Sequence, residues 1–126
     1  MKKKILIPIS VFLVGGLIFI WIFMSKYYVP SFHLSDYQSD IDYCAVDEKV
    51  EPITNKEEAQ IQAKKLWTKL YGKESVEVLE ICTVYYDGGS DCWLVEGKPP
   101  YLKYLGGELS MIASSDGKVL AVWAVK

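Results

Sequence analysis

The sequence contains no arginine and a single histidine, His33. Arginine is the residue best suited to paired contacts with phosphate and guanine, so its absence argues against nucleic acid as a partner. One histidine in a polar stretch provides neither a metal site nor a base placed beside a nucleophile, and the carboxylates lack the spacing of a metal site. The residues therefore indicate no catalytic constellation, and we expect neither a metal nor another cofactor.

Only the N-terminal part of the chain contains a long apolar run. Residues 5–24 carry no charge, and an α-helix needs roughly 20 such residues to cross the hydrocarbon core of a membrane. A cleaved signal peptide begins in the same way, but this run is too long and lacks a small-x-small site after it. Lysines at 2–4 place the N-terminus in the cytoplasm. We expect residues 1–28 to be an uncleaved single-pass anchor, with the remaining chain outside the cytoplasm.

The rest of the chain is acidic. After residue 26 there are ten lysines against sixteen acidic residues, which gives a net charge of −6. Residues 29–52 contain many of these acids and show no sustained periodicity, so we interpret them as an acidic linker. Such a charge suits either solubility or a basic protein partner.

Residues 54–72 carry the pattern of an amphipathic helix. Thr54 or Asn55 can cap its first turn, and Gly72 is placed to end it. Between them, apolar residues recur at helical spacing. This stripe consists of Ala59, Ala63, Leu66, Trp67 and Leu70. A single helix with one apolar face must bury that face against the strands that follow it.

Four runs rich in β-branched and aromatic residues follow the helix, at residues 76–86, 92–95, 108–113 and 118–125. Glycines in the turns at 88–89 and 116–117 predict two hairpins. With 88–89 at the centre of the first turn, Val84 faces Trp93, and the face they share takes the helix. The last strand is apolar on both faces, so either it is central or its second face meets another element. We expect an α+β fold, with one amphipathic helix on a four-stranded antiparallel meander.

The same register predicts where the cysteines lie. Cys82 points toward the helix, while Cys92 points to the outer face of the sheet. Outside the cytoplasm, three cysteines permit one disulfide and one free thiol. Cys44 and Cys92 are the candidate pair, and three unpaired thiols are the alternative.

Residues 53–126 contain a set of motifs in a distinctive order. A helix ends at Tyr71-Gly72, a Trp-x-Val-x-Gly run occupies 93–97, a Gly-Gly-strand begins at 106, and Asp-Gly-Lys-Val-Leu occupies 116–120. This order resembles the nuclear-transport-factor-two-fold immunity proteins, which bacteria encode beside polymorphic toxins. The resemblance implies a cystatin-like fold and a non-enzymatic protein that binds and blocks a cognate toxin. The chain departs from many relatives in its membrane span and in lacking a histidine near its end.

Two surfaces are candidates for contact with a partner. The first is a loop stiffened by two prolines, where tyrosines can serve as interface anchors. It contributes Tyr101, Leu102 and Tyr104. Alternatively, Leu102 and Leu105 fold back onto the sheet edge. The second surface lies at the first hairpin and combines tyrosines with acids. It contributes Tyr85, Tyr86, Asp87 and Asp91.

Three classes of function are weighed against these features. The first is immunity by occlusion of a toxin, with the domain boundaries 1–28 anchor, 29–52 linker and 53–126 binding domain. The second is an extracytoplasmic inhibitor or chaperone-like module that resembles the propeptides of secreted peptidases. The third, an enzyme, needs a base beside a nucleophile, which the sequence does not present. We therefore expect a non-enzymatic binding protein.

Overall fold

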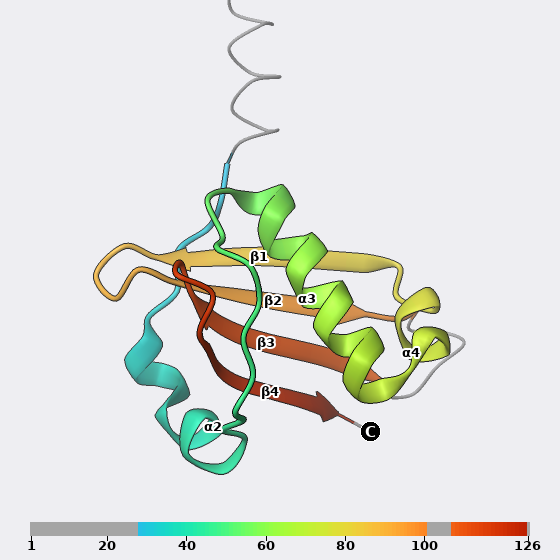
Figure 1. The fold of residues 1–126 in the computed structure, drawn as a ribbon. Coiled ribbons are helices and arrows are strands. Elements are labelled where there is room, and N and C mark those ends of the chain that lie inside the picture. Colours follow the sequence, from blue (N-terminus) through green and yellow to red (C-terminus); the bar gives the residue numbers. More distant parts are fainter. Residues whose placement is uncertain (1–27, 101–106, 126) are drawn as a thin grey trace, which may run out of the picture.

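The computed structural model describes residues 28–100 and 107–125. These residues form a four-stranded antiparallel sheet in the order β1-β2-β3-β4, with a long helix across one face (Figure 1). The strands are β1 (Ile81–Asp87), β2 (Cys92–Lys98), β3 (Glu108–Ser114) and β4 (Val119–Val125). The helices are η1 (Leu34–Tyr37), α2 (Gln38–Tyr43), α3 (Lys56–Tyr71) and α4 (Lys73–Glu77). The predicted α+β meander with its helix is confirmed.

The predicted membrane span at residues 5–24 lies outside the described part of the chain, and it stays a prediction. Within residues 28–100 and 107–125, none of the helices has the length and apolar character that crossing a membrane requires.

Helix α3 begins and ends where the sequence predicts. The Asn55 side-chain oxygen accepts a hydrogen bond from the Glu58 backbone N–H at 2.8 Å, which caps the first turn. Gly72, with φ of +93°, ends the helix. Most of the predicted stripe is buried, whereas Leu70 is 38% exposed. The buried members are Ala59, Ala63, Leu66 and Trp67.

Trp67 is the centre of the core between α3 and the sheet. Its side chain is fully buried, and its indole N–H donates to the Ser110 carbonyl at 3.3 Å. Gly97 on β2 makes room for it, because a Cβ at that position would lie 3.1 Å from the indole ring and 2.7 Å from Leu79. In the Trp-x-Val-x-Gly run, Trp93 and Val95 therefore fill the core, and Gly97 leaves room for the ring of Trp67.

The first hairpin differs in register from the prediction. Val84 pairs with Val95, not with Trp93, because the turn contains four residues, 88–91, in place of two. A shift of two residues leaves every side chain on the same face, so the predicted helix-facing side is still correct. The strand also starts later than residue 76, since Lys73–Glu77 form the short helix α4.

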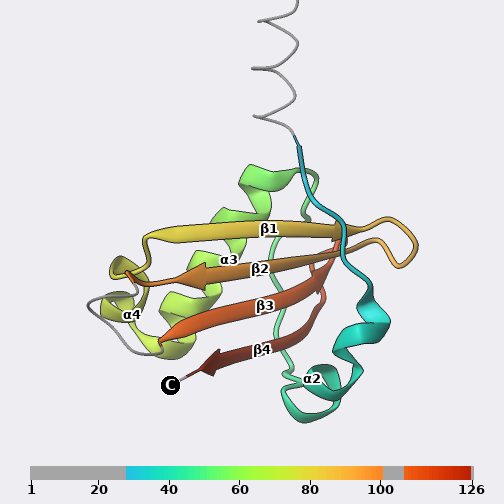
Figure 2. The ribbon, with the colours of Figure 1, turned by 180° about the vertical axis from the view of Figure 1, so that it is seen from behind.

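The segment predicted as a linker, residues 29–52, packs against the sheet instead of forming a spacer. Its first part, with η1 and α2, covers the outer face (Figure 2), whereas Val46 and Val50 pack into the core on the α3 face. Phe32 is buried on the outer face with Cys92, Leu94 and Ile112. Tyr37 stacks near Trp123, with ring centroids 6.3 Å apart. The sequence left open whether β4 is central in the sheet or contacts another element on its second face. The structure shows the contact with another element.

The same segment also pairs with the edge of the sheet. Residues 44–53 run antiparallel to residues 115–122 through backbone hydrogen bonds of 2.8–3.2 Å. Among them, the Val50 N–H donates to the Gly117 carbonyl at 2.8 Å. At the opposite edge, the Tyr86 N–H on β1 donates to the Pro30 carbonyl at 3.0 Å. The interpretation of residues 29–52 as a spacer is therefore wrong. Backbone groups at an exposed sheet edge are strong hydrogen-bond partners, and this extended segment pairs with them.

Candidate functional site

Two turns meet at one end of the sheet. They are the β1–β2 turn, residues 88–91, and the β3–β4 turn, residues 115–118, and the Ser115 N–H donates to the Asp91 carbonyl at 3.0 Å. Asp91 has φ of +55°, a conformation that aspartate adopts more readily than most residues. Asp116 accepts a hydrogen bond from the Lys118 N–H at 3.0 Å inside its own turn. Aspartate side chains therefore shape both turns.

A hydrogen-bond network centred on Asp91 joins the two turns. One oxygen, Oδ1, accepts from the Tyr86 hydroxyl and from the Ser115 hydroxyl, each at 2.6 Å. The Trp93 indole N–H donates to the Ser115 hydroxyl oxygen at 2.9 Å, and the rings of Tyr86 and Trp93 lie 4.6 Å apart. Each member of this network holds another in place, so this end of the sheet is preorganised.

The carboxylates at this end are held in their ionised form. Hydrogen bonds from the hydroxyls of Ser115 and Tyr86 lower the pKa of Asp91. The pKa of Asp87 is lowered mainly by the Leu34 backbone N–H, and that of Asp116 mainly by the Ser114 hydroxyl. The bond to Asp91 raises the pKa of Tyr86, so its hydroxyl stays protonated. This arrangement presents fixed negative charge, to which lysine and arginine side chains can donate hydrogen bonds.

The structure brings together only some of the residues predicted at this hairpin. Tyr86 and Asp91 are in contact. Asp87 lies beside them, and its Oδ2 accepts from the Leu34 N–H at 3.0 Å, so it also fixes the N-terminal segment. Tyr85 lies on the opposite face, packed against the outer core. The loop residues of the first predicted surface, Tyr101, Leu102 and Tyr104, lie outside the described part of the chain and stay predictions.

Three further residues at this end of the sheet were not predicted there, namely Ser115, Trp93 and Asp116. The Asp-Gly pair at 116–117 predicts a turn, but no local pattern predicts that this turn meets the β1–β2 turn. That contact depends on the pairing of β2 with β3, in which Trp93 lies opposite Ala113. The pairing is fixed by tertiary packing, which a single sequence does not display.

The predicted Cys44–Cys92 disulfide is absent, and all three cysteines are free thiols. Cys92 is buried in the outer core, and its thiol donates to the Ser90 carbonyl at 3.4 Å. Burial raises the pKa of the Cys92 thiol and also that of Cys82. Thiols with raised pKa values are poor nucleophiles, because the thiolate is the reactive form.

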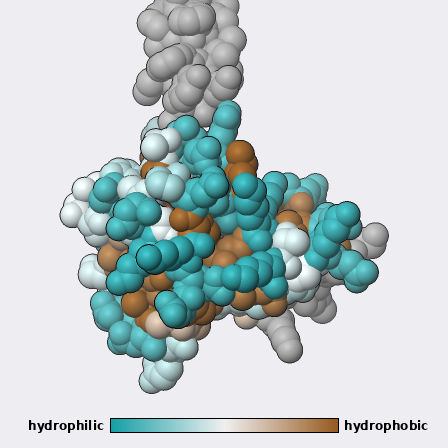
Figure 3. All heavy atoms as spheres, viewed as in Figure 1, coloured by the Kyte–Doolittle hydropathy of each residue, from teal (hydrophilic) through white to brown (hydrophobic). Residues whose placement is uncertain are grey.

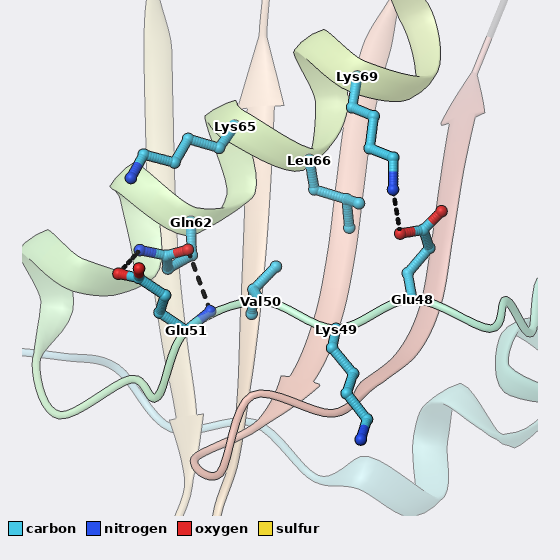
Figure 4. A pocket seen from close by; sticks show the side chains of 8 residues that line it. All are labelled: Glu48, Lys49, Val50, Glu51, Gln62, Lys65, Leu66 and Lys69. Carbon is cyan, nitrogen blue, oxygen red and sulfur yellow. Dashed lines mark hydrogen bonds and ion pairs between the residues drawn. The ribbon is translucent and has the colours of Figure 1, made fainter.

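A groove of about 310 Å³ separates α3 from the segment 48–51 (Figure 4). Lys69 and Glu48 form an ion pair across it at 2.9 Å. Gln62, which is 3% exposed, accepts from the Glu51 backbone N–H at 3.2 Å and donates to its carboxylate at 3.4 Å. Lys49 points away from the helix (Figure 4). These contacts fasten residues 48–51 to α3, and we interpret the groove as a structural contact between them.

The rest of the α3 face is mainly hydrophilic, with hydrophobic residues visible between polar ones near its middle (Figure 3). In the described ranges, the His, Cys, Asp and Glu side chains form no group of three that could hold a metal ion. No protein-family model, curated protein or solved structure matches the chain.

Proposed function

We propose that this protein is a membrane-anchored immunity protein that binds a cognate bacterial toxin and blocks it by occlusion. The observation that carries the proposal is the rigid acidic end of the sheet, where the Asp91 network holds two turns and their carboxylates in place. The helix on an antiparallel meander is the architecture expected of cystatin-like immunity proteins, and the motif order of residues 53–126 supports the same family.

The expected partner has a basic surface. The part of the chain after residue 26 carries a net charge of −6 and contains no arginine. Asp87, Asp91 and Asp116 are held ionised at one end of this acidic domain. Complementary charge accelerates association and fixes the orientation of the bound partner. Because the carboxylates are already positioned, binding costs little side-chain entropy.

The anchor restricts where the toxin acts. With residues 1–28 as a membrane span and the lysines at 2–4 in the cytoplasm, the binding domain lies outside the cytoplasm. Protection is then needed at the membrane face or beyond it, and a nuclease that acts in the cytosol is not the target. The partner class is therefore a basic protein that acts in the cell envelope.

The proposal is tested by coexpressing the full chain with the toxin encoded beside its gene. We expect survival with the wild-type chain and saturable binding of the purified toxin. The double variant Asp91→Asn/Asp116→Asn removes two charges but keeps the oxygens that accept the hydrogen bonds in both turns. We expect it to bind at least about tenfold more weakly and with a smaller dependence on salt.

The matched control for this test is Glu57→Gln/Glu74→Gln, which removes the same net charge from exposed helix positions. It should bind almost as well as the wild-type chain. Equal weakening in the two double variants would mean that only overall charge matters and would contradict a site at the turns. Failure of the wild-type chain to bind or protect against the neighbouring toxin would reject the immunity function.

The proline-stiffened loop is tested separately. We expect Tyr101→Ala/Tyr104→Ala to weaken toxin binding while the melting temperature stays near that of the wild type, since tyrosine is a favoured interface anchor. Tyr43→Ala is the control, because Tyr43 is also a tyrosine, is 90% exposed, and belongs to α2 instead of the loop. Equal losses of binding and thermal stability in the double variant would show that the two rings belong to the core.

A further inference from the structure

The middle of the outer sheet face carries one carboxylate among aromatic side chains. Strand pairing places four residues opposite one another in a single row across this face, namely Thr83, Glu96, Ser110 and Trp123. Trp123 packs against the outer core, which fixes the face to which the row belongs. Figure 2 shows that η1 and α2 cover only the turn end of this face. The row therefore lies next to the edge of the outer cover.

Glu96 and Trp123 flank the small residue of the row, Ser110. Neighbouring strands lie about 4.8 Å apart, so Glu96 and Trp123 are separated by about 10 Å at the backbone. Ser110 is 4% exposed, so larger side chains cover it, whereas Glu96 and Trp123 are both partly exposed. One ligand group placed above Ser110 can therefore reach the carboxylate and the indole ring together.

Two tyrosines complete this arrangement. Tyr37, in η1, lies beside Trp123, with ring centroids 6.3 Å apart. Tyr85 pairs with Leu94, so it is a diagonal neighbour of Glu96, within reach for an aromatic side chain. Burial raises the pKa of Tyr37, and the Glu96 carboxylate and the Tyr85 hydroxyl raise it further. Three partly exposed rings thus surround one carboxylate.

We propose that this aromatic-acidic patch, formed by Tyr37, Tyr85, Glu96 and Trp123, binds an arginine side chain of a basic protein partner. That this partner is the toxin rests on the proposed function. The faces of aromatic rings attract cations, and tryptophan does so most strongly. A guanidinium group can stack on a ring with its flat face while its N–H groups donate to a carboxylate, which an ammonium group does less well.

The charges around the patch favour a cation from another molecule. Asp36 and Asp40 are close enough to add to the rise in the pKa of Tyr37. In the part of the chain that the structure describes, the ion pairs do not include Glu96. The chain contains no arginine, so an arginine in the patch must belong to a partner. Complementary charge of this kind fixes the orientation of a bound partner.

The experiment uses the full chain in lipid nanodiscs, with isotope-labelled tryptophan, and the peptide acetyl-Gly-Arg-Gly-amide as the probe. We expect a saturable shift of the Trp123 indole signal, and an unchanged signal from Trp93, which lies at the turns on the other face. Citrulline in place of arginine keeps the shape without the charge and should weaken binding at least about tenfold. Lysine should weaken it about threefold. Absence of a saturable shift at tens of millimolar peptide, or equally tight binding of either substitute, would overturn the proposal.

Protein variants provide the matched comparison. Glu96→Gln keeps the shape of the side chain and should weaken binding of the arginine peptide at least about tenfold. Glu57→Gln removes the same charge from an exposed position on α3 and should bind like the wild type. Equal binding by these two variants would overturn the proposal. Binding seen only in Lys98→Ala/Lys103→Ala would also overturn it, because a lysine of this chain would then be the occupant.

The peptide and the toxin give independent results. A toxin that binds while the arginine peptide does not would remove the patch and leave the proposed function standing. An arginine peptide that binds at Trp123 while the neighbouring toxin does not bind would reject the proposed function and leave the patch as a site for another basic protein.

Discussion

The two faces of the sheet are covered in different ways. On one face, the regular helix α3 buries a periodic stripe around Trp67. On the other, the two short helices η1 and α2 form the cover, and Phe32 inserts beside Cys92 and Leu94. The first cover is one element with its own caps, and the second is held by single side chains and backbone hydrogen bonds. The comparison suggests that α3 and the sheet form the stable unit and that the outer cover opens more easily.

The strongest test of that difference is Trp67→Ala. Trp67 is fully buried and contacts the sheet opposite Gly97, so its truncation leaves a cavity that the neighbouring strands cannot fill. We expect a loss of about 3–5 kcal/mol in the free energy of unfolding, measured by chemical denaturation. Leu70→Ala on the same helix is the control, since Leu70 is 38% exposed, and it should cost less than about 1 kcal/mol. Comparable losses would show that the helix side is not the main core.

Phe32→Ala tests the outer face. Phe32 is 8% exposed and packs near Tyr37, with ring centroids 5.8 Å apart. We expect a loss of about 3 kcal/mol, at the low end for a buried aromatic residue, because the short outer elements can relax around the gap. Native-state hydrogen exchange should show faster exchange in α2 and unchanged protection in α3. Equal loss of hydrogen-exchange protection in α2 and α3 would show that the outer cover does not open separately from α3 and the sheet.

Gly117→Ala tests the backbone contact between residues 44–53 and the sheet. Gly117 has φ of +98°, and an added Cβ would clash with the Val50 carbonyl oxygen. We expect a loss of about 2 kcal/mol, from backbone strain and from displacement of residues 44–53. Gly88→Ala is the control, because its Cβ would approach nothing closer than 3.8 Å. If the two substitutions cost the same, close approach of residues 50–51 is not what requires glycine at 117.

Local signals in the sequence predicted the helix side of the fold well. The Asn55 cap, the stripe around Trp67 and the stop at Gly72 depend on neighbouring residues, which periodicity and capping rules describe. The packing of residues 29–53 was missed, because they use short helices and an irregular edge pairing that leave no period. Phe32 and Val50 are held by contacts with the sheet, which no local sequence pattern describes.

The same limit applies to the candidate site. The Asp-Gly turn at 116–117 and the acidic first turn could be predicted separately, each from its own residues. Their contact through Ser115 and Asp91 depends on the pairing of β2 with β3. The short helix α4 was likewise missed, because the β-branched residues from 76 onward predict a strand. Local chemistry was therefore predictable, and the juxtaposition of distant segments was not.

The smallest effect is expected where the two turns meet, and it appears as pH dependence. The folded protein lowers the pKa of Asp91 below its usual value of 3.8, so the stability that this carboxylate contributes is fully present above that value. It is lost as the pH falls through the lower folded-state pKa. Asp91→Asn cannot ionise, but it keeps the accepting oxygen and tolerates φ of +55°. The variant should therefore lose less stability than the wild type between about pH 5 and pH 2.

Ser115→Ala sharpens this last test, because the Ser115 hydroxyl is the main cause of the lowered pKa. Without that donor, the folded-state pKa of Asp91 moves back toward its usual value, and the acid dependence should become shallower, as in Asp91→Asn. Denaturant midpoints measured across the pH series provide the comparison. Identical slopes for the wild type and both variants would mean that Asp91 makes no pH-dependent contribution and that the turns are held by the Trp93 packing and their backbone hydrogen bonds.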